Sequence, residues 1–126
     1  MSVVIDTSIL IDHLRGDDRA HRLLERLRAK HVLVGSVLTR VEVIGGMRHL
    51  EQRQTFQLLS TIEWIVVDQA IADRAGELAR RYIRSHPGID PVDYVIAATS
   101  ESLTADLFTR NLKHFPMFPG LLYPYE

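Results

Sequence analysis

The chain has 126 residues, 46% of them apolar, and a formal net charge of −1. This length and apolar content suffice for a buried core and lie outside the compositions that stay disordered, so we expect residues 1–126 to form a single domain. The absence of cysteine excludes a disulfide framework, a thiolate metal site and a cysteine nucleophile.

The first residues, Met-Ser-Val-Val-Ile-Asp, lack the basic region and the long apolar stretch of a secretory signal. No run approaches the roughly 20 apolar residues that a membrane span needs. We therefore expect a cytoplasmic protein that does not enter a membrane. The near-neutral charge does not by itself indicate a nucleic-acid binder, although acids that hold divalent ions would leave the rest of the surface more basic than the total suggests.

Short apolar runs alternate with amphipathic segments along the chain. In chain order they predict a strand at 3–6, a helix at 8–14, a helix capped by Asp17, a strand at 31–35, helices at 37–47 and 49–60, a strand at 64–67, helices at 69–85 and 90–100, a strand at 107–109 and a candidate fifth strand at 121–123. Strands that alternate with helices indicate a three-layer α/β/α fold around a short central parallel sheet of four or five strands.

Three acidic residues occupy settings that are unusual for solvent-exposed charge: Asp6 ends the first apolar run, Glu42 lies within Val-Glu-Val-Ile, and Asp93 precedes Tyr-Val-Ile-Ala-Ala. In a parallel sheet all three would face the carboxyl edge of the strands, where α/β proteins gather their ligands. Gathered carboxylates repel one another unless cations lie between them, and Mg²⁺ or Mn²⁺ prefers such oxygen ligands. The sequence therefore predicts a magnesium or manganese site.

Four hydrogen-bonding residues could position a water or a phosphate: Thr7 and Ser8, directly after Asp6, and Thr109 and Asn111, at the end of the predicted strand at 107–109 and just beyond it.

Each acid also has a purely structural interpretation. Asp6 is a favoured residue for capping a following helix. The spacing of Thr39 and Glu42 fits a capping box, and Asp90-Pro91-Val92-Asp93 is typical of a helix start. Asp90 is an alternate ligand, although its place before Pro91 favours a cap.

Four short motifs in order resemble the signature of PIN-domain nucleases, and more narrowly of VapC-type ribonuclease toxins. They are Val-Val-Ile-Asp-Thr-Ser at 3–8, Arg-Val-Glu at 40–42, Asp-Tyr-Val-Ile-Ala-Ala-Thr at 93–99 and Leu-Phe-Thr-Arg-Asn-Leu-Lys-His-Phe at 107–115. The resemblance implies a metal-dependent endoribonuclease that hydrolyses RNA phosphodiester bonds, in which Asp6, Glu42 and Asp93 form the acidic triad. It also implies a cognate VapB-like antitoxin and a homodimer.

The chain departs from the family pattern at its last motif. Many PIN domains carry a fourth acid in a Thr-x-Asp sequence, whereas Thr109-Arg110-Asn111 places an amide there. An amide lacks the negative charge of a carboxylate, which argues against a firmly held second metal. Asn111 would instead orient the attacking water or the scissile phosphate.

Two other functions stay open at this point. The six histidines (His13, His21, His31, His49, His86 and His114) could serve a metal-free ribonuclease, but they are scattered in sequence and proton transfer needs close, oriented partners. A phosphoacceptor receiver module also gathers acids and Mg²⁺ at a sheet edge. Val67-Asp68 could supply its acceptor, yet Asp6 stands alone at the first strand where a receiver needs an acidic pair.

Overall fold

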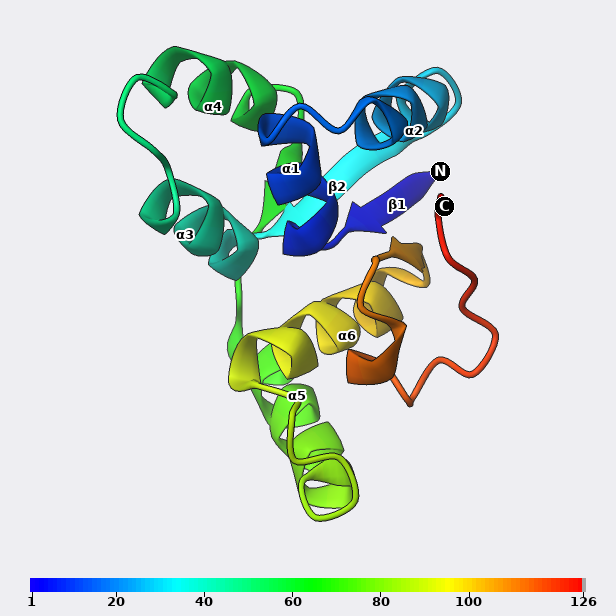
Figure 1. Cartoon of the computed structure of the whole chain (residues 1–126). Helices are drawn as coiled ribbons and strands as arrows, with labels where there is room; N and C mark the ends of the chain where they lie inside the picture. Colours follow the sequence, from blue (N-terminus) through cyan, green and yellow to red (C-terminus); the bar gives the residue numbers. More distant parts are fainter. Residues whose placement is uncertain (126) are drawn as a thin grey trace.

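The computed structural model describes residues 1–125, which contain a parallel sheet (Figure 1). Its strands are β1 (Ser2–Ile5), β2 (Val32–Ser36), β3 (Glu63–Ile65) and β4 (Asp106–Phe108), in the order β3-β2-β1-β4. β1 is central, and its Val4 pairs with Val34 on one side and Leu107 on the other. The carboxyl ends of all of these strands therefore meet at one edge of the sheet.

The helices flank this sheet. They are α1 (Thr7–Leu14), α2 (Asp18–Arg28), α3 (Val37–Gly45), α4 (Gln52–Leu59), α5 (Gln69–Tyr82) and α6 (Pro91–Leu103), and a 3-10 turn, η1 (Leu112–His114), follows β4. α5 and α6 lie on one side of the sheet and α1, α2 and α4 on the other (Figure 1). No helix within residues 1–125 is long and apolar enough to cross a membrane.

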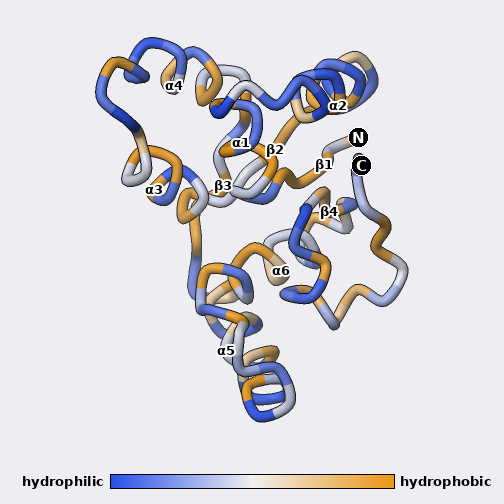
Figure 2. Tube along the Cα trace, viewed as in Figure 1, coloured by the Kyte–Doolittle hydropathy of each residue, from blue (hydrophilic) through white to orange (hydrophobic). Residues whose placement is uncertain are grey.

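Two apolar clusters fill the spaces between the layers. Val3 and Ile5 pack with α1, α2 and α4, whereas Val4 packs with α5 and α6. Neighbouring residues of β1 point to opposite faces because side chains alternate along a strand. Figure 2 shows the consequence: the central strands are hydrophobic, and long stretches of the outer helices are hydrophilic. The predicted three-layer α/β/α fold is confirmed.

Helix starts at the ends of strands put polar side chains at the carboxyl edge. Asp6 and Ser36 cap α1 and α3 through bonds from the backbone N–H groups of Ser8 and Leu38. An oxygen at this position satisfies a helix N–H group that has no partner within the helix. The connection from strand to helix therefore needs a polar residue here, whatever the function.

The predicted fifth strand is wrong. Residues 121–123 form no strand, and the side chains of Leu122 and Tyr123 are 83% and 60% exposed. This apolar run is not buried in the sheet because the segment after η1 runs outside it and is tied instead to α1, where the Tyr125 hydroxyl donates a hydrogen bond to Asp12.

Candidate active site at the carboxyl edge of the sheet

Asp6 lies at the centre of the carboxyl edge, and only 2% of its surface is exposed. Its Oδ2 accepts hydrogen bonds from the hydroxyls of Ser8 and Thr109, both at 2.8 Å, and from the backbone N–H of Ser8 at 3.4 Å. The capping interpretation of Asp6 is thus confirmed. All of these bonds fall on one oxygen, and Oδ1 accepts none from residues 1–125, so capping leaves that oxygen for a ligand.

Glu42 lies on α3 and is joined to the first helix. The hydroxyl of Thr7 donates a 2.6 Å hydrogen bond to Oε1 of Glu42. The capping-box interpretation of Glu42 is wrong, because Ser36, not Thr39, caps α3. Burial raises the pKa of Glu42; the bond from Thr7 opposes this shift, and the negative charges of Asp90 and Asp6 add to it.

Asp93 both caps a helix and faces the other acids. The backbone N–H of Asp93 donates to Oδ1 of Asp90 at 3.1 Å, and the backbone N–H of Asp90 donates to Oδ2 of Asp93 at 3.3 Å. This reciprocal cap confirms the predicted helix start. Burial raises the pKa of Asp93 to about 6, as do the charges of Asp90 and Asp6; the Asp90 backbone bond and His114 act against the rise.

His114 is a member of this group that the sequence did not single out. Its Nδ1 lies 3.0 Å from Oδ2 of Asp93. The contact depends on the turn η1, which brings residue 114 back toward α6. No periodicity in the sequence encodes that turn.

The hydroxyl and amide residues divide into two groups. Thr7, Ser8 and Thr109 bond directly to the acids. The backbone N–H of Asn111 donates to Thr109 Oγ1 at 3.0 Å, and the residue is exposed. Asn111 therefore lies one bond further from Asp6 than Thr109 does.

The donor chemistry of this edge fits a hard divalent cation. Burial raises the pKa values of Glu42 and Asp93, and the negative charges of Asp90 and Asp6 add to both shifts. Oxygen ligands of this kind suit Mg²⁺ or Mn²⁺. Within residues 1–125, however, no three His, Cys, Asp or Glu side chains are arranged to hold an ion as they stand. Glu42 and Asp93 are turned toward Thr7 and His114 instead.

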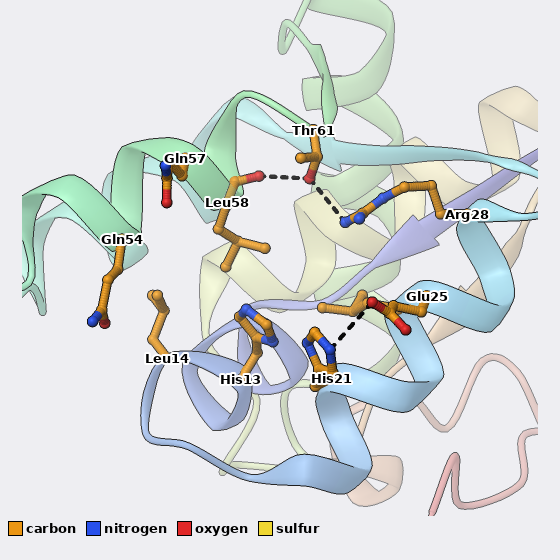
Figure 3. A pocket seen from close by; sticks show the side chains of 10 residues that line it. His13, Leu14, His21, Glu25, Arg28, Gln54, Gln57, Leu58 and Thr61 are labelled. Atoms are coloured by element: carbon orange, nitrogen blue, oxygen red, sulfur yellow. Dashed lines mark hydrogen bonds and ion pairs between the residues drawn. The ribbon is translucent and has the colours of Figure 1, made fainter.

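Two histidines meet elsewhere, away from the acidic edge. The rings of His13 and His21 are stacked, with their centres 5.3 Å apart. They line a cavity of about 300 Å³ between α1, α2 and α4 (Figure 3). His21 pairs with Glu25 at 3.2 Å, whereas Nδ1 of His13 is buried without a partner within residues 1–125. This pair lies apart from the hydroxyl-bonded carboxylates, which favours the acidic edge over a histidine pair as the reactive centre.

The sheet order argues against the receiver interpretation. A receiver-like sheet has the order 2-1-3-4-5, which puts its third strand beside its first. Here β2 separates β3 from β1. Asp68, which caps α5 after β3, is therefore two strands away from Asp6.

The α/β/α fold and the buried carboxylates at the carboxyl edge define an α/β protein whose sheet edge suits a divalent cation. Comparisons with known proteins identify the family within this class. The PIN domain family model matches residues 3–116. Ribonuclease VapC19 of Mycobacterium tuberculosis is 46% identical over 123 residues, which cover 97% of this chain and 98% of the relative. Ribonuclease VapC10 of the same organism is 42% identical, over 98% of this chain and 92% of the relative.

A solved toxin–antitoxin complex from Klebsiella pneumoniae contains a chain of the same fold. Its TM-score is 0.81 at 32% identity, over 98% of each chain. The chain described here therefore belongs to the PIN-domain family and, within it, to the VapC-type proteins.

Proposed function

We propose that this protein is a divalent-metal-dependent endoribonuclease and the toxin of a toxin–antitoxin pair. The observation that carries the proposal is the group of carboxylates at one sheet edge, in which Asp6 and Asp93 are buried, Glu42 is half-buried and Asp6 is held by Ser8 and Thr109. The names of the relatives, ribonuclease VapC19 and VapC10, support RNA as the substrate.

Asp6, Glu42 and Asp93 would hold the ion, which we propose to be Mg²⁺ or Mn²⁺. Each has a carboxylate oxygen that accepts no bond from residues 1–125, while the other is fixed by a hydroxyl, a backbone N–H or a histidine. A bound divalent ion supplies the positive charge that lowers the pKa of an attacking water and neutralises the phosphoryl oxygens.

The chain's own residues would orient the reaction. Thr7, Ser8 and Thr109 fix the carboxylates, so their negative charges stay where the ion is needed. Asn111, exposed at the rim, would orient the attacking water or the scissile phosphate. No protein nucleophile is required, and cleavage would leave a 5′-phosphate and a 3′-hydroxyl.

A VapB-like antitoxin would neutralise the protein. The support is the likeness to a chain of a solved toxin–antitoxin complex. We also propose a homodimer as the form of the toxin and the cytoplasm as its location.

The proposed function is tested by cleavage of a labelled RNA transcript with MgCl₂ or MnCl₂, and with EDTA. We expect cleavage with either metal, none in EDTA, and loss of roughly 100-fold or more in Asp6→Asn and Asp93→Asn, the scale of effect when a group that stabilises transition-state charge is removed. Asp68→Asn is the matched control, because Asp68 caps a helix after another strand. Its activity should match that of the wild type, and circular dichroism should show every variant folded.

Undiminished cleavage in EDTA, or by the Asp6 and Asp93 variants, would overturn the proposed chemistry. The antitoxin is tested separately, by co-expressing the small protein encoded beside this gene. A stable complex that suppresses RNA cleavage is expected; free toxin activity in its presence would refute the pairing.

A further inference from the structure

A second cavity of about 530 Å³ lies beside the acidic edge, and of the residues that line it only Asn111 has a role in the chemistry above. Its lining combines two cations, an amide and two aromatic rings: Arg19, Arg110, Asn111, Tyr123 and Tyr125. Its volume lies within the range of small-molecule sites, which is about 300–1,000 Å³. The cavity can therefore hold a group of nucleotide size.

The cavity is held together by Asp12 of α1. The carboxylate of Asp12 accepts a short hydrogen bond from the Tyr125 hydroxyl and pairs with Nε of Arg110 at 3.1 Å. Burial and Asp12 raise the pKa of Tyr125, so its hydroxyl stays protonated and keeps donating. The guanidinium of Arg19 lies 5.1 Å from the centre of the Tyr125 ring. These contacts hold the segment after η1 against α1 and against the loop that follows β4.

The same loop joins the cavity to the proposed active site. The backbone N–H of Arg110 donates to Ser8 Oγ at 3.1 Å, and that of Asn111 donates to Thr109 Oγ1 at 3.0 Å. Both hydroxyls in turn bond to Asp6. A strand of nucleic acid with its scissile phosphate near Asp6 would therefore place an adjoining nucleotide at this cavity.

The lining offers the two contacts that single-stranded RNA needs. Nε of Arg110 pairs with Asp12, whereas its two terminal nitrogens make no hydrogen bond or ion pair with residues 1–125. Both terminal nitrogens can therefore donate hydrogen bonds to one phosphate. The side chain of Tyr123 is 60% exposed. Unstacked RNA bases bind by stacking on aromatic side chains, whereas bases in a duplex are already stacked.

We propose that this cavity is a subsite for one nucleotide of single-stranded RNA next to the scissile bond. Arg110 contacts its phosphate and Tyr123 stacks on its base. The inference rests on the proposed ribonuclease function and adds to it the residues that select an unpaired substrate. Asp12 and Asp17 already pair with Arg110 and Arg19. Binding therefore depends on specific contacts more than on net charge.

The test measures RNA binding without cleavage. A fluorescein-labelled 12-nucleotide single-stranded RNA of mixed sequence is titrated with the full-length protein in EDTA, and its anisotropy is followed. We expect Tyr123→Ala and Arg110→Gln each to weaken binding roughly 10-fold, the scale of one lost stacking or charged contact. Arg110→Gln should also reduce the slope of log Kd against log salt concentration by about 1.

Two matched controls lie outside the cavity. Leu122→Ala removes a neighbour of Tyr123 that is even more exposed, and Arg84→Gln removes an exposed arginine just beyond α5. Both should bind as the wild type does. A duplex of the same sequence should bind weakly, and Tyr123→Ala should not change its affinity.

Unchanged RNA affinity in both cavity variants, or equal losses in the controls, would overturn the subsite. Loss of antitoxin binding with unchanged RNA binding would overturn it too, since the cavity would then receive a protein segment. These outcomes leave metal-dependent cleavage by the wild type intact. Failure of the proposed function would instead appear as absent cleavage, whatever the anisotropy.

Discussion

Thr109 and Asp6 are 103 residues apart in sequence, yet the hydroxyl of Thr109 donates a 2.8 Å hydrogen bond to Oδ2 of Asp6. Both residues are almost completely buried. The bond exists because β4 pairs directly with β1, which brings the ends of the two strands together.

Thr109→Val should destabilise the fold by about 1–3 kcal/mol, because a buried carboxylate and the N–H of Asn111 both lose a partner. RNA cleavage should fall with it, since Asp6 is less firmly oriented. Urea unfolding followed by circular dichroism measures the stability. Thr109→Ser keeps the hydroxyl and is the control; a valine variant as stable as the serine variant would contradict the assigned role of this bond.

Stability should depend on pH through Asp93. Its pKa is raised from 3.8 to about 6 in the folded protein, so its contribution to stability is fully present below pH 3.8 and is lost as the pH rises through about 6. In EDTA, the unfolding free energy of the wild type relative to Asp93→Asn should therefore fall between pH 4.5 and 7. Urea unfolding across that range measures the difference, and a flat or rising difference would contradict the burial argument.

The stability should depend on pH in the opposite direction through His13. Burial lowers its pKa from 6.5, and His21 and Arg28 lower it further. The unfolded chain then binds the proton more readily, so stability is lost as the pH falls below 6.5. The unfolding free energy of the wild type relative to His13→Gln should decrease between pH 7 and 5. If the two proteins respond alike to acid, His13 is not the group responsible.

Much of the fold follows from local pattern. The alternation at Val3, Val4 and Ile5 predicts a strand buried on both faces, and Asp17 and Asp90 predict helix starts that the structure contains. The pairing of β4 with β1 does not follow, because periodicity says nothing about which strands are neighbours. The contact between Asp6 and Thr109 depends on that pairing.

The C-terminal tail shows a second limit of local pattern. An apolar run at 121–123 has the composition of a strand, but its place is decided by the distant pair Tyr125 and Asp12. The approach of His114 to Asp93 likewise depends on one turn. The acids and the hydroxyl residues Thr7, Ser8 and Thr109 were therefore predictable as candidates, whereas the pairing of each hydroxyl with a particular acid and the approach of His114 were not.

A substitution at Gly35 tests the packing of β2 against Trp64. A Cβ at this position would lie 2.8 Å from the ring of Trp64, which cannot easily move because its Nε1 donates to the carbonyl of Leu59 at 3.0 Å. Gly35→Ala should cost about 1–3 kcal/mol from overpacking. Gly76→Ala in α5 meets no atom within 4 Å and should instead stabilise by about 0.5–1 kcal/mol. Thermal or urea unfolding compares the two, and equal effects would contradict the close approach at Gly35.

The most direct measurement of the metal site is anomalous scattering from a crystal soaked in MnCl₂. We expect a manganese peak about 2.0–2.3 Å from carboxylate oxygens of Asp6 and Asp93, with Glu42 bound to the ion directly or through a water. Asp6→Asn should abolish this peak. A peak at another surface with none at this edge, under saturating Mn²⁺, would contradict the claim that these carboxylates share an ion.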